Sequence, residues 1–143
     1  MIVNKRIELF TDSSVNPQTK IGFAAYLQRD DKSISLEALR NIIKIKKFEN
    51  SSSTKLELQS FLWALDEIKE QKKDILDYEI VVYTDCQNII SLKTRKERLE
   101  KNNYHSSTGK LISNHDLYIK FYDEIDKFRY KFCKSKRTQE NNS

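Results

Sequence analysis

The sequence predicts an α/β fold with one mixed five-stranded sheet flanked by helices. The predicted elements run in the order three strands, helix, strand, helices, strand. Three consecutive strands form an antiparallel meander, and the later alternation of helix and strand gives parallel crossovers. The chain has 143 residues, which is the usual length of one domain and enough to bury a core without disulfides. We therefore expect residues 1–143 to form a single domain.

The first three strands are marked by hydrophobic pattern and turn residues. Residues 5–12 alternate apolar and polar side chains, as a half-buried strand does. Asn16-Pro17 marks a turn, and the apolar run over 21–27 then forms the hairpin partner. Residues 34–48 are ambiguous, because leucines at helical spacing compete with an isoleucine-rich run typical of a strand. We predict a strand there.

The remaining elements alternate helix and strand. The serines before Thr54 suit a helix N-cap, and Glu57 stands three residues after Thr54, as in a capping box. Apolar residues then recur at helical spacing, whereas a later β-branched run suits a buried strand. The pattern predicts a helix over 54–72, a strand over 80–83, a helix beginning after Asp85, a helix around 117–125 and a strand over 128–133.

Composition excludes several classes of protein. Hydrophobic residues make up 38% of the chain and charged residues 33%, with two Gly and one Pro, so collagen-like and low-complexity chains are excluded. No apolar run reaches the ~20 residues of a membrane span. The start of the sequence lacks the apolar segment of a secretion signal, and two cysteines are too few for a disulfide framework. We expect a cytoplasmic protein that does not associate with membranes.

The positive charge is concentrated in the last third of the sequence. The net charge is +5, and residues 91–143 alone carry 13 basic and 7 acidic side chains. Positive charge is densest over 93–101, which contains five basic residues and two glutamates. Such a segment suits binding to a polyanion, because each Lys or Arg near a phosphate releases counterions. The alternative is a solvated helix face.

Three acids stand at the ends of predicted elements. Asp12 and Asp85 each follow a Thr at the end of a strand, and Glu57 lies near the start of a helix. Such carboxylates can converge at one edge of a mixed sheet, where their mutual repulsion requires cations. Oxygen ligands of this kind select Mg²⁺ or Mn²⁺. Asp12 and Asp85 could instead cap the elements that follow them, and Glu57 could complete a capping box, but the three together favour a metal site.

The motifs around these acids resemble the ribonuclease H family. The segments Phe10-Thr-Asp-Ser-Ser-Val-Asn-Pro17, Ser53-Thr-Lys-Leu-Glu57-Leu and Tyr83-Thr-Asp85-Cys-Gln87 are similar to its first three motifs, in the same order. The resemblance extends to about residue 133, and Arg95–Leu117 is similar to a bacterial branch of the superfamily. It implies a ribonuclease H-like arrangement of the five-stranded sheet.

The resemblance also implies an activity. Members of the family hydrolyse the RNA strand of RNA–DNA hybrids with two Mg²⁺ ions, for which Mn²⁺ can substitute. Carried over by motif, Asp12 would bridge both ions, and Glu57 and Asp85 would hold the ion at the leaving group. The expected partner is an RNA–DNA hybrid duplex, and we expect a monomer.

Two groups of residues are expected to contact nucleic acid. By motif match, the first group lies along the minor groove, where the 2′-hydroxyls distinguish RNA from DNA. It comprises Ser13, Asn16, Ser53, Thr54 and Gln87. The second group would contact phosphates of the DNA strand without reading its sequence. It comprises Lys93, Arg95, Lys96 and Arg98.

The family has a fourth carboxylate that opens a final helix, and this sequence shows no such helix before it ends. The acid that follows the last predicted strand is Glu140, which we interpret as a tail residue. We therefore expect cleavage to be slow and to need high Mg²⁺ or Mn²⁺. One alternative is a non-catalytic or weakened hybrid-binding module that lost this ligand. Another is a related nuclease of the same superfamily that acts on a different structure, such as a DNA junction.

Overall fold

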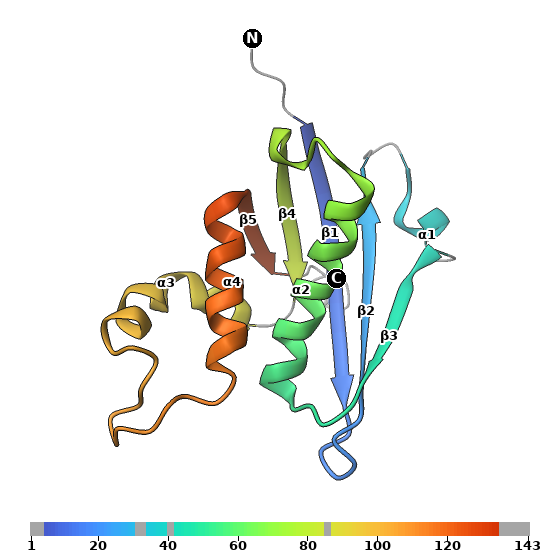
Figure 1. The fold of residues 1–143 in the computed structure, drawn as a ribbon. Helices are drawn as coiled ribbons and strands as arrows, with labels where there is room; N and C mark the ends of the chain where they lie inside the picture. The colour runs from blue at the N-terminus through green and yellow to red at the C-terminus, as the bar shows by residue number, and fades with distance from the viewer. Residues whose placement is uncertain (1–4, 31–33, 40–41, 85–86, 135–143) are drawn as a thin grey trace, which may run out of the picture.

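The computed structural model describes residues 5–30, 34–39, 42–84 and 87–134. Its centre is one mixed sheet in the order β3-β2-β1-β4-β5 (Figure 1). β1 (Lys5–Val15), β2 (Gly22–Arg29) and β3 (Lys44–Phe48) are antiparallel neighbours, whereas β4 (Tyr78–Thr84) and β5 (Arg129–Lys134) extend the sheet in parallel. The predicted mixed five-stranded sheet is confirmed.

Helices α2 (Ser53–Gln71) and α4 (His115–Lys127) lie side by side in front of the sheet in Figure 1. α3 (Gln87–Lys101) follows β4 and contacts the β4–β5 side of the sheet. A short 3₁₀ helix, η2 (Ile75–Asp77), leads into β4. Within the described part of the chain, no helix is long and apolar enough to cross a membrane.

The segment between β2 and α2 differs from the prediction of one strand over 34–48. The structure has a short helix, α1 (Leu36–Leu39), before strand β3. Leu39 is buried at its end, and the Ser35 hydroxyl accepts a hydrogen bond from the Ala38 N–H at 3.1 Å, which stabilises the first turn. The helical spacing of the leucines therefore applies to the first part of the segment, and the strand pattern applies only to the second.

The start of α2 also differs from the prediction. The N-cap is Ser52, whose side chain accepts a hydrogen bond from the Lys55 N–H at 3.3 Å. The helix consequently begins at Ser53, and Thr54 lies inside it. Glu57 is then the fifth helical residue and not the third, so the capping-box interpretation of Glu57 is wrong.

The core lies between α2, α4 and one face of the sheet. Ile7 and Leu9 of β1 are fully buried there, because the alternation of a strand sends both side chains to the same face. Phe61 of α2 joins the layers, with its ring centroid 5.4 Å from that of Phe121 in α4 and 5.7 Å from that of Phe132 in β5. These aromatic contacts hold both helices on the sheet.

The first turns of α2 pack closely on the β1–β2 hairpin. A Cβ placed on Gly22 would lie 2.5 Å from Leu56 Cδ2 and 3.1 Å from the Ser14 carbonyl oxygen. Leu56 is fully buried and cannot move aside without disturbing its neighbours. Gly22 is therefore needed for the close approach of helix and hairpin, because any side chain would push them apart.

We predict that Gly22→Ala lowers the free energy of unfolding by about 1–3 kcal/mol, the usual cost of overpacking a core. Urea denaturation of the wild type, Gly22→Ala, Leu56→Ala and the double variant measures this cost. Shortening Leu56 removes the clash, so the double variant should be less destabilised than the sum of the single variants. Strict additivity would contradict the contact.

Candidate active site

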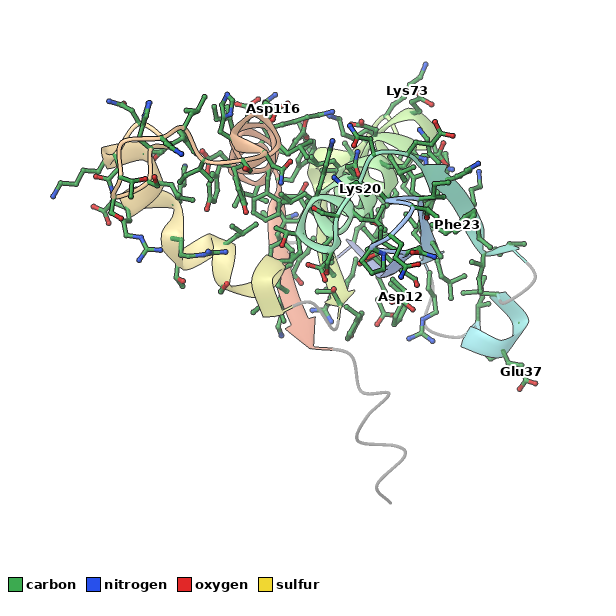
Figure 2. The ribbon with its side chains drawn as sticks, turned by 90° about the horizontal axis from the view of Figure 1, so that it is seen from below. Asp12, Lys20, Phe23, Glu37, Lys73 and Asp116 are labelled. Atoms are coloured by element: carbon green, nitrogen blue, oxygen red, sulfur yellow. The ribbon has the colours of Figure 1, made fainter. Side chains whose placement is uncertain are left out.

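Asp12 stands on the part of β1 that extends beyond β4. The pairing of β1 with β4 ends at Phe10–Tyr83, while its pairing with β2 continues to Val15–Gly22. The Asp12 side chain is exposed, and its Oδ1 accepts a hydrogen bond from the Ser13 N–H at 2.9 Å. In Figure 2 it lies on the opposite side of the molecule from Asp116 at the start of α4. The carboxylate is therefore open to a ligand from solvent.

Glu57 lies in the second turn of α2, between the fully buried Leu56 and Leu58. Its own side chain is half-buried. The contact of Leu56 with Gly22, which pairs with Val15, fixes the position of this helical turn. It lies at the end of β1 that carries Asp12, so the structure brings the first two predicted acids to the same end of the sheet.

The third predicted acid, Asp85, lies outside the described residues; it follows Thr84, the last residue of β4, directly in sequence. Among the described residues, no cluster of three or more His, Cys, Asp or Glu side chains is placed to hold a metal ion. The described acids, Asp12 and Glu57, offer carboxylate oxygens, the ligands that Mg²⁺ and Mn²⁺ prefer. Their chemistry fits the expected ions.

A polar network beside Asp12 was not anticipated from the sequence. The Tyr83 hydroxyl donates a hydrogen bond to Glu8 Oε2 at 3.1 Å, and Arg29 Nε donates to Glu8 Oε1 at 2.7 Å. Burial, followed by the hydrogen bond to Glu8, raises the pKa of Tyr83. Strand alternation could have indicated that Glu8 shares a face with Asp12, but its partners are distant in sequence.

The residues expected to contact the minor groove lie on β1, on the β1–β2 turn and at the starts of α2 and α3. Ser13 follows Asp12 on β1, and Ser53 and Thr54 lie in the first turn of α2, with Ser53 exposed and Thr54 half-buried. Asn16 holds the β1–β2 turn, since its Oδ1 accepts hydrogen bonds from the Gln18 and Thr19 N–H groups at 2.9 and 3.3 Å. Gln87 is the first residue of α3, and its side chain is not described.

The basic residues of α3 are in different environments. Lys96 Nζ lies 2.6 Å from Asp126 Oδ2 of α4, and this hydrogen bond raises the pKa of Lys96. Arg95 is half-buried, whereas Arg98 is exposed and lines an open pocket of about 610 Å³. Lys93 lies on the same helix, and its side chain is not described. Arg98 is thus more accessible to a phosphate than Lys96.

Several solved structures have the same fold as this chain. LC11-RNase H1 in complex with an RNA/DNA hybrid is 14% identical, with a TM-score of 0.66, over 96% of this chain and 91% of the other. LC9-RNase H1, a type 1 RNase H with the type 2 active-site motif, is 15% identical, with a TM-score of 0.70, over 94% and 64%. A foamy viral protease-reverse transcriptase in complex with dsDNA is 13% identical, with a TM-score of 0.69, over 99% and 90%.

Sequence comparisons identify the family. A ribonuclease H from Actinobacillus succinogenes is 30% identical over 121 residues, which are 82% of this chain and 68% of that protein. The family model for RNase H matches residues 4–143, a span that includes both described acids and the whole sheet. The chain therefore belongs to the ribonuclease H family.

Proposed function

We propose that this protein is a metal-dependent endonuclease that hydrolyses the RNA strand of RNA–DNA hybrids. The observation that carries the proposal is the placement of Asp12 and Glu57 at the same end of the sheet, on β1 and on the second turn of α2. Family membership supports it, as does the fold shared with LC11-RNase H1, which was solved with a hybrid.

The proposed chemistry assigns a role to each acid. Two divalent ions, when bound, activate the attacking water and stabilise the leaving 3′-oxygen. Asp12 would hold both ions, and Glu57 and Asp85 would hold the one at the leaving group. The exposed Asp12 carboxylate is accessible to cations from solvent, and the half-buried Glu57 is held by its packed neighbours. Cleavage by this route leaves 5′-phosphate and 3′-hydroxyl ends.

Substrate choice in this proposal depends on the 2′-hydroxyls of the RNA strand, which a wide minor groove displays. Ser53 and Thr54 lie in the first turn of α2, one turn before Glu57. Their hydroxyls can donate to or accept from a 2′-hydroxyl. This arrangement would bring the RNA strand, and not the DNA strand, to the acids.

We predict that Asp12→Asn lowers the rate of hybrid cleavage about a thousandfold. The amide keeps the shape of the side chain but loses the charge that holds the cations, and metal ions supply several kcal/mol of charge stabilisation, at 1.36 kcal/mol for each factor of ten. The assay follows labelled hybrid, single-stranded RNA, duplex DNA and a DNA junction, each with Mg²⁺ and with EDTA.

Each outcome of this assay distinguishes a function. Hybrid cleavage that stops with EDTA and with Asp12→Asn supports the proposal. Hybrid binding without turnover at any Mg²⁺ or Mn²⁺ concentration would instead identify a binding module, and preferential cleavage of the junction would identify a related nuclease. Cleavage that survives Asp12→Asn would refute the role of Asp12.

We predict that Arg98→Ala lowers the slope of log binding constant against log salt by about 0.9, the value for one phosphate contact. Lys96→Ala should lower it less, because its ammonium is already paired with Asp126 in the free protein. Lys5→Ala, at the opposite end of β1 beside Asp74, serves as the control with no change. Equal slopes for wild type and Arg98→Ala would show that Arg98 is only a solvent-exposed helix residue that contacts no phosphate.

The need for a fourth carboxylate stays a prediction, since Glu140 lies outside the described residues. We expect the rate of cleavage to keep rising with Mg²⁺ into a high concentration range, because Asp12 is the one described carboxylate assigned to the ion that would activate water. Titration of the wild type and Glu140→Gln with Mg²⁺ and Mn²⁺ tests this. Full activity at low Mg²⁺ in both proteins would show that no further acid is required.

A further inference from the structure

Four side chains form a closed ring of contacts on the face of the sheet that carries Asp12. The rings of Phe10 and Tyr83 are stacked, with centroids 4.7 Å apart and planes 9° apart. Tyr83 donates its hydroxyl hydrogen to Glu8, and Glu8 forms an ion pair with Arg29 at 2.7 Å. The Arg29 guanidinium carbon lies 5.8 Å from the centroid of the Phe10 ring. We call these four residues the Glu8 ring.

The Glu8 ring connects the three strands at the centre of the sheet. Arg29 comes from β2, Glu8 and Phe10 from β1, and Tyr83 from β4. Glu8 is only 4% exposed, so its charge is balanced by Arg29 and by the Tyr83 hydroxyl with little access of water. A nearly buried carboxylate is sensitive to its hydrogen-bond geometry, because removing a partner costs more than the same loss at the surface.

The Glu8 ring lies at the point where β1 stops pairing with β4 and continues to pair with β2. Phe10 is the last residue of β1 that pairs with β4, and its partner there is Tyr83. Two residues later, Asp12 pairs with Ala25 of β2. Alternation along β1 puts Glu8, Phe10 and Asp12 on the same face. The stacked pair is therefore the last backbone pairing with β4, among the described residues, before the segment that carries the carboxylate.

We infer that Tyr83 and Glu8 are positioning residues, which fix the direction of the Asp12 carboxylate by anchoring β1 to β4 two residues before it. The inference rests on the proposed function, since it assigns Asp12 to a divalent cation. Groups that orient a metal ligand commonly change metal affinity when they are replaced, and here the orientation would be set through the backbone of β1.

The test measures Mn²⁺ binding to the full chain without nucleic acid, by electron paramagnetic resonance of the free ion. Tyr83→Phe keeps the stacked ring and the ion pair but removes the hydroxyl, so we expect the fold to be kept and the thermal midpoint to fall. We expect its Mn²⁺ affinity to fall about tenfold, the lower end of the range for residues that support a ligand. The thermal midpoint is measured alongside, and hybrid binding in EDTA should be unchanged.

Tyr122→Phe is the matched control. It also removes a tyrosine hydroxyl, here one that is buried between α4 and α3 and donates to the Leu92 carbonyl oxygen at 2.7 Å. Its Mn²⁺ affinity should equal that of the wild type, even if its thermal midpoint falls. A second variant of the ring, Phe10→Leu, removes the stack and should weaken Mn²⁺ binding in the same direction as Tyr83→Phe.

The outcomes separate the inference from the proposed function. Wild type that binds Mn²⁺, with unchanged affinity in Tyr83→Phe and Phe10→Leu, would overturn the positioning role and leave the proposed function standing. An equal loss of affinity in Tyr122→Phe would also overturn it, because the effect would then follow general stability. Wild type that binds no Mn²⁺ would overturn the proposed metal site, and the inference with it.

Discussion

The packing of α2 on the central strand β1 is the contact on which the rest of this structure depends. Ile7 and Leu9 are fully buried on that face of β1, and Phe61 of α2 reaches both α4 and β5. Because Gly22 lets Leu56 approach the hairpin, α2 begins at the end of β1 that carries Asp12. The same burial that stabilises the core therefore determines where Glu57 stands.

The two faces of β1 carry different kinds of side chain and make different contacts. One face is apolar and supplies the core, whereas the other carries Glu8, Phe10 and Asp12. On this second face, a nearly buried ion pair replaces the aliphatic contacts that would otherwise hold the neighbouring strands. Such a pair adds little to stability compared with apolar packing, but its geometry is specific. A strand that must present a carboxylate to solvent gains more from specific geometry than from further buried area.

Much of the fold could be predicted from the sequence, because its signals are local. Alternation in β1 and helical spacing in α2 both arise from neighbouring residues, and both elements were found. The capping of α2 was wrong because Ser52 and Thr54 are both good N-caps, and the choice between them depends on the path of the chain. The prediction of a strand over 34–48 was wrong in its first part, because a helix of four residues is too short to give a recognisable hydrophobic pattern.

Candidate acids could be found from strand ends, but their surroundings could not. Glu8 meets Arg29 and Tyr83 across 21 and 75 residues of sequence, and Lys96 meets Asp126 across 30. Nothing in the local pattern of Glu8 distinguishes it from a solvated residue on the polar side of a strand. Similarly, the basic run of α3 does not reveal which of its side chains is already neutralised by α4. These pairings follow from the order of strands and from helix packing, which are tertiary properties.

The parallel pairing of β1 with β4 has a consequence for how the chain reaches this state. Lys5 pairs with Tyr78, so the central strand cannot complete its sheet until about 70 further residues have been made. Until then, β1 and β2 can form only an antiparallel hairpin, whose free edge exposes unpaired backbone groups. Contacts between such distant segments slow folding, and synthesis at about 5–20 residues per second would leave that edge open for several seconds. During synthesis, β1 is thus open to wrong pairing along the edge that β4 later covers.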